Sequence, residues 1–473
     1  MLAESFPLLS LLVWLPLAAA AGLRFVPEQW TIPIGLGVAT AELAVIVALL
    51  ASFDTDSGAM QFAESGFVLG PLRYALGLDG VSVLFPALSA FLALLALLYG
   101  LALGAGRGYV TAVLVYLTAL LGLFCATNPW LFWLFAALET GAAAFMLWRF
   151  SADTGRSRTA IRFLQFSGSG LLFGLLGTAL LPAAGVPPQA AFVLLLCGFF
   201  LRLPLFPLHG WFPEAARHGG LAAVAVVLLG GAKTGLYGIV RFILPPFPEA
   251  LARWHDALSL LAIAGVFYGA LMALNQTNFR RMLAFAVVSH TSALLLGILT
   301  LNLNGLRGAM LMLLETGLAS AGLFLAAELT IMRCGTALLP RLGGVFDTLP
   351  ALGLMFLIAA LSLMAMPGTP GFDAAHLLLD GLLESHGPAM TVALALGNVL
   401  TAAFLLGAFQ RVFLARRKAR RHGPPAPLSL CEHLLAGAVS LALLAGFHTH
   451  PWLEHIDDAL PPLLEAFLDE PQP

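Results

Sequence analysis

The chain has 473 residues, of which 60% are hydrophobic and only 10% are charged, and its mean hydropathy is +0.93. This composition excludes an ordinary soluble domain, which carries far more charge, and gives no basis for nucleic-acid binding. The formal net charge of −2 at pH 7 is less informative than the distribution of charge along the chain. We therefore expect an all-α polytopic membrane protein.

Fourteen apolar segments are long enough to cross a bilayer as helices. In chain order they are 5–24, 31–53, 80–104, 109–126, 129–149, 160–182, 190–209, 220–243, 255–274, 280–301, 306–333, 350–379, 388–414 and 428–447. We divide the chain into helices 1–3 (1–104), a first five-helix repeat with helices 4–8 (105–245), a second with helices 9–13 (250–415), and helix 14 with an external acidic tail (425–473).

Two of these segments contain clusters of proline and glycine that interrupt a helix. The seventh ends in residues 203–214 (LPLFPLHGWFPE), and the twelfth contains residues 366–372 (MPGTPGF). Irregular backbone at membrane depth is tolerated only where it is buried in protein or lines water. Because the breaks lie five segments apart, we predict two five-helix repeats of inverted topology, each with one discontinuous helix.

The loops alternate in charge. Those that follow odd-numbered segments hold 17 basic residues, and those on the other side hold four. The positive-inside rule then places the odd loops in the cytoplasm and both termini in the periplasm of a bacterial inner membrane. The basic loops 149–162 and 411–421 are candidate docking surfaces for a cytoplasmic partner, although they equally fit a role in topology alone.

Lys233 is one of only two lysines in the chain and lies inside an apolar stretch. A lysine at membrane depth costs about 3 kcal/mol or more, so such residues tend to mark ion or proton paths. A buried lysine, unlike an arginine, can release its proton near neutral pH. Further ionisable side chains lie within apolar segments or next to a break, and with Lys233 they form our candidate proton path: Glu139, Arg202, His290, Glu315, Asp373 and His376.

Each of these residues also has a structural interpretation. Glu139 and Arg202 could form an ion pair that fixes helix packing, since a buried charge needs a partner. His290 could be a core histidine with satisfied hydrogen bonds, and Lys233 could serve packing alone.

Four segments resemble a known family. Residues 202–216 (RLPLFPLHGWFPEAA), 233–242 (KTGLYGIVRF), 275–290 (NQTNFRRMLAFAVVSH) and 308–324 (GAMLMLLETGLASAGLF) are similar to the proton-conducting, antiporter-like subunits of respiratory complex I, above all the M-type subunit. Residues 76–83 (LGLDGVSV) resemble the start of that family's third helix, and the resemblance runs from about residue 76 to 415. The superfamily includes Mrp sodium/proton antiporters, membrane-bound hydrogenases and the membrane subunit of the DAB inorganic-carbon complex.

The resemblance implies roles for four residues. Glu139 matches the family's helix 5 glutamate, Lys233 its helix 8 lysine and His290 a helix 10 histidine. Arg202 replaces the helix 7 lysine, and since a guanidinium does not readily lose its proton, it could tune Glu139 rather than relay.

The second half of the chain departs further from the complex I pattern. Glu315 stands where that pattern has a histidine, and Ala375, flanked by Asp373 and His376, where it has a glutamate. We therefore predict an output path rebuilt around Glu315, Asp373 and His376, and a divergent branch of the family.

These departures narrowly favour the proton-conducting subunit of an inorganic-carbon (CO2/bicarbonate) uptake complex with a cytoplasmic zinc partner. The alternatives are a proton-pumping subunit of a complex I-like NADH or ferredoxin:quinone oxidoreductase or membrane hydrogenase, an Mrp-type Na+/H+ antiporter subunit, and a structural membrane anchor. We find no motif for zinc, flavin, nucleotide or an iron–sulfur cluster, so we expect no cofactor in this chain and assign such chemistry to partner subunits.

Overall fold

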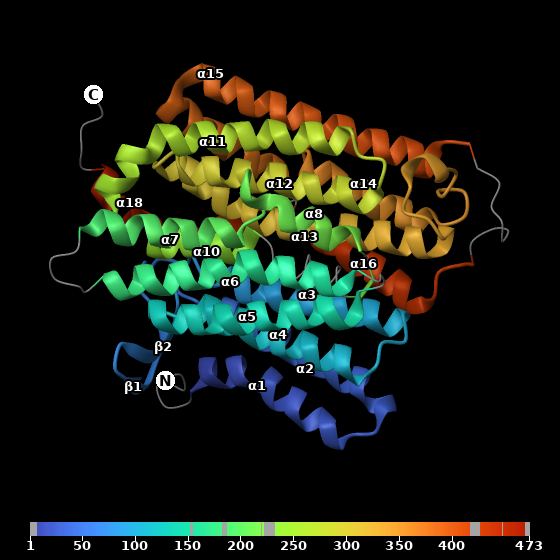
Figure 1. The fold of residues 1–473 in the computed structure, drawn as a ribbon, viewed down its shortest axis with the longest axis horizontal. Helices are drawn as coiled ribbons and strands as arrows, with labels where there is room; N and C mark the ends of the chain where they lie inside the picture. The colour runs from blue at the N-terminus through green and yellow to red at the C-terminus, as the bar shows by residue number, and fades with distance from the viewer. Residues whose placement is uncertain are drawn as a thin grey trace.

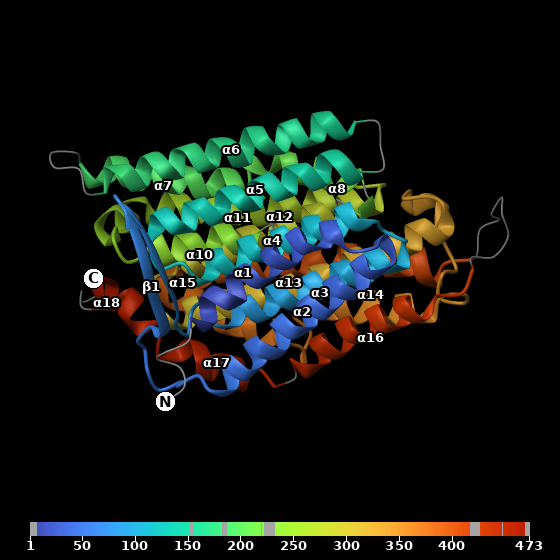
Figure 2. The same cartoon turned by 90° about the horizontal axis from the view of Figure 1, so that it is seen from below.

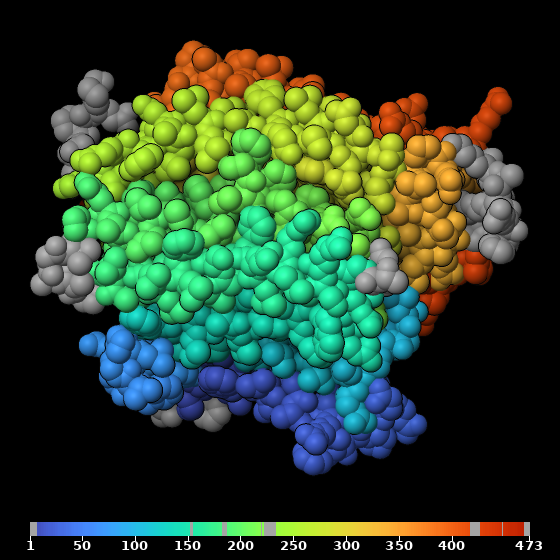
Figure 3. Space-filling view, in the orientation of Figure 1, coloured from blue at the N-terminus to red at the C-terminus, as the bar shows by residue number. Residues whose placement is uncertain are grey.

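The computed structural model describes residues 7–151, 155–181, 187–218, 220–221, 232–416, 426–446 and 448–468. Its helices lie side by side along one direction, with α1 and α2 at one edge and α11 and α15 at the other (Figure 1). Successive parts of the chain form successive bands across one face (Figure 3). Each predicted apolar segment overlaps a helix in the described ranges, but the twelfth crosses a break between two helices and shares the second of them with the thirteenth.

The longer elements are α1 (Leu8–Gly22), α2 (Glu28–Ala51), β1 (Gln61–Leu69), β2 (Leu72–Leu78), α3 (Leu84–Ala102), α4 (Arg107–Cys125), α5 (Pro129–Phe150), α6 (Arg156–Leu180), α7 (Pro188–Arg202), α8 (Trp211–Arg217), α10 (Ala232–Phe242), α11 (Pro248–Leu274), α12 (Phe279–Ile298), α13 (Leu303–Cys334), α14 (Pro350–Leu363), α15 (Pro370–Phe409), α16 (Leu430–Ala445), α17 (His450–Asp457) and α18 (Pro461–Leu468). Short helical turns are η1 (Leu23–Phe25), η2 (Leu208–Gly210), η3 (Leu339–Arg341) and η4 (Gln410–Leu414).

Within the described ranges, ten helices are long and apolar enough to span a bilayer, or eleven if α16 and α17, bent by 65°, form one span. The apolar helices α7 and α14 are shorter because each ends at a break. The all-α polytopic membrane class is therefore confirmed. The count of fourteen spans and the inverted repeats stay predictions, and residues 222–231 of the eighth segment lie outside the described residues.

Helix ends follow local sequence signals. Asn128, Asn278 and Asn302 cap α5, α12 and α13 through side-chain oxygens that accept backbone N–H groups. Ser429 forms a capping box at the start of α16, and Gly335, with φ of 71°, ends α13 in the left-handed conformation. These caps satisfy backbone groups that would otherwise be unpaired at the ends of apolar helices.

The structure confirms both helix breaks. α7 stops at Arg202, and the chain continues through η2 into α8. α14 stops at Leu363, and Ala365 and Gly368 adopt positive φ before α15 begins. α15 is itself kinked at Gly387, where φ is 74° and ψ is −177°. The breaks leave helix ends inside the bundle, where their carbonyl groups become available to side chains.

A β-hairpin precedes α3 and is absent from the sequence-based prediction. β1 and β2 pair antiparallel from Gln61↔Leu78 to Leu69↔Leu72. Figure 2 shows the hairpin at one end of the helical bundle. Its Glu64 carboxylate accepts hydrogen bonds from Ser10 N at 2.9 Å and Ser10 Oγ at 2.6 Å, and so stabilises the positive N-terminal end of α1.

Close packing between α6 and α7 yields a stability prediction. A Cβ at Gly198 would lie 2.8 Å from Gly174 N and 2.9 Å from Gly174 Cα, whereas a Cβ at Gly168 on α6 would meet nothing within 4 Å. We expect Gly198→Ala to lower the stability of the purified protein by about 1–3 kcal/mol, because the helices must separate. Thermal unfolding measures the effect, and Gly168→Ala is the control. Equal unfolding temperatures for the two variants would contradict this packing.

Candidate functional site

A buried ion pair joins α5 to the end of α7. Arg202 Nη2 donates to Glu139 Oε2 at 2.5 Å, and both residues are less than a tenth exposed. Arg202 Nη1 also donates to Thr140 Oγ1 at 2.8 Å, and the hydroxyl of Tyr116 donates to Glu139 Oε1 at 3.3 Å. A buried ion pair is tolerated when further hydrogen bonds satisfy its remaining polar atoms, and this pair meets that condition.

Lys233 lies on α10 next to this pair. The neighbouring Thr234 Oγ1 donates to Glu139 Oε1 at 3.4 Å, and Lys233 interacts electrostatically with Glu139. The lysine is buried, and its Cδ lies 3.4 Å from the place that a Cβ of Gly317 would occupy. Gly317 follows Glu315 by two residues on α13. Lys233 therefore lies between the first-half ion pair and the helix that carries the second-half carboxylate.

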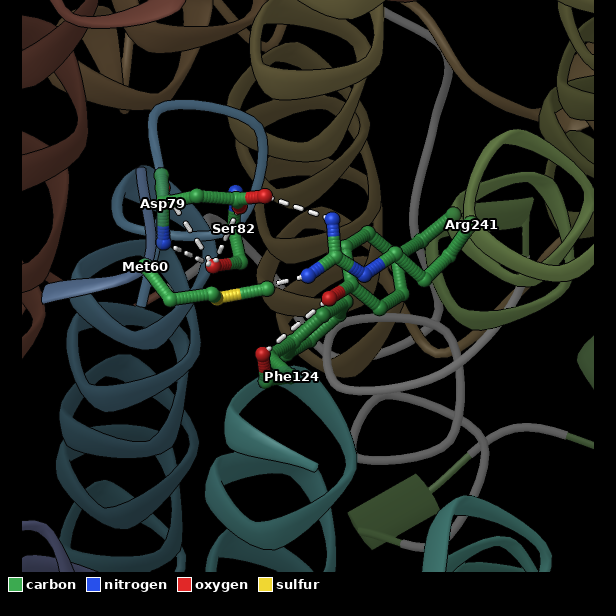
Figure 4. A network of polar contacts seen from close by, with 6 residues as sticks. Met60, Asp79, Ser82, Phe124 and Arg241 are labelled. Carbon is green, nitrogen blue, oxygen red and sulfur yellow. Dashed lines mark hydrogen bonds and ion pairs between the residues drawn. The ribbon is translucent and has the colours of Figure 1, made fainter. Parts of the chain in front are cut away.

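A second ion pair anchors α10. Arg241 Nη1 donates to Asp79 Oδ2 at 2.5 Å, and Ser82 N and Oγ donate to Asp79 Oδ1 at 3.1 and 2.9 Å (Figure 4). Tyr237 Oη donates to the carbonyl of Phe124 at 3.2 Å. Arg241 follows Lys233 by two helical turns, about 12 Å of rise, so these contacts fix the lysine-bearing helix along its axis. They also give a physical role to the segment 76–83.

The second half holds a buried carboxylate and a buried imidazole. Ser362 Oγ, near the end of α14, donates to Glu315 Oε1 at 2.7 Å. His290 Nε2 lies 2.9 Å from the carbonyl oxygen of Leu363, and Nδ1 lies 3.0 Å from that of Ala286. A neutral imidazole has one N–H, so His290 can donate to both carbonyls only in its doubly protonated form. One of the two acceptors exists because α14 ends here.

Glu315 and His290 share a cavity of about 120 Å³ with Ser362, Ser289 and Asn398. Asn398 Nδ2 also donates to the carbonyl of Met364, in the same break, at 3.1 Å. Because one water needs about 10–15 Å³, the cavity has room for several waters. The cavity beside Glu139, Arg202 and Trp211 measures only about 10 Å³. The two halves therefore differ in their capacity for water.

His209 lies between the two halves, in the turn after α7. Its ring centroid is 4.9 Å from that of Tyr268 on α11 and 5.9 Å from that of Phe285 on α12. Within the described part of the chain, His209 Nδ1 and Trp211 Nε1 are buried without a hydrogen-bond partner. The first helix break thus places the ring of His209 beside helices of the second half, whereas the ring of Trp211 packs on Phe163 of α6.

Asp373 and His376 lie elsewhere. The Asp373 carboxylate accepts a hydrogen bond from Thr449 Oγ1 at 2.5 Å, and the side chain of His376 is 67% exposed. Neither residue lines the Glu315 cavity, whereas Ala375 does. Successive residues of a helix point about 100° apart, so neighbours in sequence do not share a face. The structure does not bring these two side chains to Glu315.

Several polar residues of the site were not predicted from the sequence. Tyr116, Ser362, Asn398 and Thr140 lie in apolar helices, where a hydroxyl or amide carries little signal by itself. Two of them had a positional clue: Thr140 directly follows Glu139, and Ser362 lies four residues before the predicted break. Their partners come from other helices, and only the packing shows which side chains meet.

The fold and the buried charges define a polytopic membrane protein with a row of ionisable groups and two discontinuous helices. The family model described as "NADH:quinone oxidoreductase/Mrp antiporter, TM" matches residues 160–401. The chain belongs to this family.

Relatives of known family and solved structures support the same assignment. The chain is 30% identical to NAD(P)H-quinone oxidoreductase chain 4 of Gloeobacter violaceus, over 86% of this chain and 82% of that protein. It is 30% identical to NADH-quinone oxidoreductase subunit M of Rhodobacter capsulatus, over 86% of each. A chain of respiratory complex I from Thermus thermophilus superposes with a TM-score of 0.85 at 27% identity, over 96% of this chain and 99% of that chain. The Mrp complex from Dietzia sp. shares the fold, with a TM-score of 0.88 at 21% identity, over 97% of this chain and 98% of that chain.

The buried ion pair yields a stability prediction. We expect Glu139→Gln to destabilise the protein by about 3–5 kcal/mol, because Arg202 stays charged and loses its buried counter-ion. The double variant Glu139→Gln/Arg202→Met should be more stable than Glu139→Gln, since it buries no unpaired charge. Thermal unfolding of the purified single and double variants measures this difference. Strictly additive losses would show that the two residues do not stabilise each other.

Proposed function

We propose that this chain conducts protons across the membrane as an antiporter-like subunit of a multisubunit energy-coupling complex. The observation that carries the proposal is the alignment of buried ionisable groups across both halves. Lys233 interacts electrostatically with Glu139 and packs against Gly317 of α13, the helix that also carries Glu315. Each such group in an apolar bundle is costly, and a row of them is typical of proton relays in pumps and transporters.

Arg202 and Lys233 have different parts in this mechanism. Arg202 stays charged and neutralises Glu139 directly, through the 2.5 Å bond. Lys233 need not stay protonated to compensate Glu139, so it can bind and release a proton as the local field changes. The first half then works as a charged switch: a proton that arrives at Glu139 weakens the field that holds a proton on Lys233.

The second half supplies the exit. Glu315 and His290 both border the 120 Å³ cavity, which is large enough for water to link them. Ser362 orients the Glu315 carboxylate by its hydrogen bond. In the proposed path Glu315 receives the proton that Lys233 releases, and water in the cavity carries it onward to His290. Asp373 and His376, which were predicted as part of the output path, enter this scheme only beyond the cavity: Asp373 is half-buried against Thr449, and His376 is exposed.

A second part of the proposal concerns which multisubunit complex contains this chain. The names of the relatives, quinone oxidoreductase chain 4 and subunit M, support a redox-coupled complex for this chain as well. The departures at Glu315 and Ala375 are what favoured an inorganic-carbon complex with a cytoplasmic zinc partner. Mass spectrometry of proteins that co-purify with the tagged chain separates these complexes and the Mrp type. Quinone-oxidoreductase subunits in place of a soluble zinc protein would overturn the carbon-uptake hypothesis.

We further propose that both termini are periplasmic and that the basic loops 149–162 and 411–421 face a cytoplasmic partner. Arg149, Arg156, Arg158, Arg162 and Arg411 belong to the described residues, whereas 152–154 and 417–421 lie outside them. Charge reversal at Arg158 and Arg162 tests the docking surface by co-purification. Unchanged recovery of the soluble partner would leave these arginines with a role in topology only.

We expect Glu315→Gln to lower proton flux at least about tenfold, because an amide keeps the shape of the side chain but carries no titratable proton. The purified complex, reconstituted in liposomes, is driven by a potassium gradient with valinomycin, and proton uptake is followed with a pH-sensitive dye.

Glu384→Gln is the matched control for this test. Glu384 is an exposed glutamate on α15 that accepts a hydrogen bond from Asn304 Nδ2 at 2.9 Å, so its loss should leave the flux unchanged. Equal subunit content of the two variant complexes shows that assembly is intact. Wild-type flux in the Glu315→Gln complex would exclude this carboxylate from the path.

A further inference from the structure

Two histidines and an aspartate meet where α11 passes the kink of α15. His255 and Asp256 lie on α11, and His386 immediately precedes Gly387, the residue with positive φ at the kink. One potential ligand atom from each of the three side chains lies within 4.8 Å of the others. None of these residues belongs to the charged row described above. α11 and α15 run along the same edge of the molecule (Figure 1).

We propose that His255, Asp256 and His386 form a binding site for a divalent transition-metal cation, of which Zn²⁺ is the best-matched example. Two imidazoles and one carboxylate are a common set for Zn²⁺, and they leave a fourth position for water. Mg²⁺ and Ca²⁺ prefer oxygen ligands, so the two ring nitrogens argue against them.

The two imidazole rings are already close together. Their centroids are 4.4 Å apart with an interplanar angle of 27°, and His255 Nδ1 lies 3.2 Å from Asp256 Oδ1. Zn²⁺ binds nitrogen and oxygen at about 2.0–2.2 Å, so its ligand atoms must approach to somewhat over 3 Å of one another. The two stacked rings must therefore rotate so that one nitrogen of each points at the metal, and the Asp256 side chain, which is 93% exposed, can follow them.

Two serines orient His386. Its Nε2 lies 2.9 Å from Ser259 Oγ on α11, and its Nδ1 lies 2.8 Å from the adjacent Ser385 Oγ. A metal-bound histidine normally uses its second nitrogen in such a hydrogen bond, which fixes the ring. One serine can keep this role while the other nitrogen turns to the metal. The site is thus supported on two helices and not only at a flexible surface.

A metal at this site would act on the helices that border the Glu315 cavity. The cavity of Glu315 is bordered by Val266 of α11 and by residues from both arms of α15, including Ala375 and Asn398. A metal held between α11 and the kink would fix these three helical segments relative to one another. By the positive-inside rule we assign the arginine-rich loops to the cytoplasm. The kink lies on the opposite side, which we assign to the periplasm.

The test uses the purified, untagged complex in detergent and ZnCl2 as the probe. Isothermal titration should show one Zn²⁺ per chain in the wild type, with a raised unfolding temperature in its presence. We expect His255→Gln and His386→Gln each to weaken this binding at least about 10–100-fold, the size of effect that loss of even an outer partner of a ligand produces. Cu²⁺ in place of Zn²⁺ should give an electron paramagnetic resonance signal with coupling to two nitrogens.

Two further variants complete the test. The Asp256 side chain is 93% exposed, so we expect Asp256→Asn to leave the fold intact and to weaken binding about tenfold. His376→Gln is the matched control, because it removes an exposed histidine that lies 3.6 Å from an aspartate, Asp380, on the same helix. Wild-type affinity in Asp256→Asn and His386→Gln, or equal loss in His376→Gln, would overturn the site. So would a wild type that binds no Zn²⁺.

Discussion

Glu139 and Arg202 face each other inside an apolar bundle, and the arrangement of the first half depends on this ion pair. An unpaired charge at this depth would cost several kcal/mol, so the helices must bring the two groups together. The break after Arg202 ends α7 where the guanidinium reaches Glu139, Thr140 and the carbonyl of Ala136. Because Arg202 is a permanent cation beside the Glu139 carboxylate, Lys233 is not needed as its counter-ion. In the proposed mechanism the arginine that replaces the family's lysine is a fixed cation, and Glu139 and Lys233 are the groups whose charge changes.

The second half also pairs a buried carboxylate with an arginine, Glu328 with Arg280, but around Glu315 and His290 it uses helix ends instead. The end of α14 and the break that follows supply carbonyl oxygens to His290 and Asn398, and Ser362 in its last turn binds Glu315. These contacts stabilise polar groups, and they border a cavity that has room for water. The protein thus combines a tightly packed ion pair of Glu139 and Arg202 in the first half with a cavity beside Glu315 and His290 that has room for water in the second half. Lys233 lies between the ion pair and the helix that carries Glu315.

The sequence predicted the features whose physical cause is local. Proline and glycine reveal helix breaks, and an isolated Lys233 or Glu139 in an apolar segment stands out because burial of a charge is expensive. It did not predict the hairpin at 61–78, whose alternation is weak beside long apolar helices, nor the pair of Asp79 with Arg241, which are far apart along the chain. It also grouped His376 with Glu315, because sequence proximity to a break does not show which way a helical side chain points. Contacts between side chains of different helices depend on how each helix is rotated about its axis. That rotation cannot be predicted from the patterns of a single sequence.

Lys233→Arg in the reconstituted complex tests the central claim most directly, because arginine keeps the positive charge and does not release a proton. The measurement is proton uptake into liposomes under an imposed membrane potential, beside the subunit content of the same preparation. The account predicts a fully assembled complex whose proton flux falls at least about tenfold. A Lys233→Arg complex that transports protons at the wild-type rate would show that this lysine provides a fixed charge only, and that protons do not pass through it.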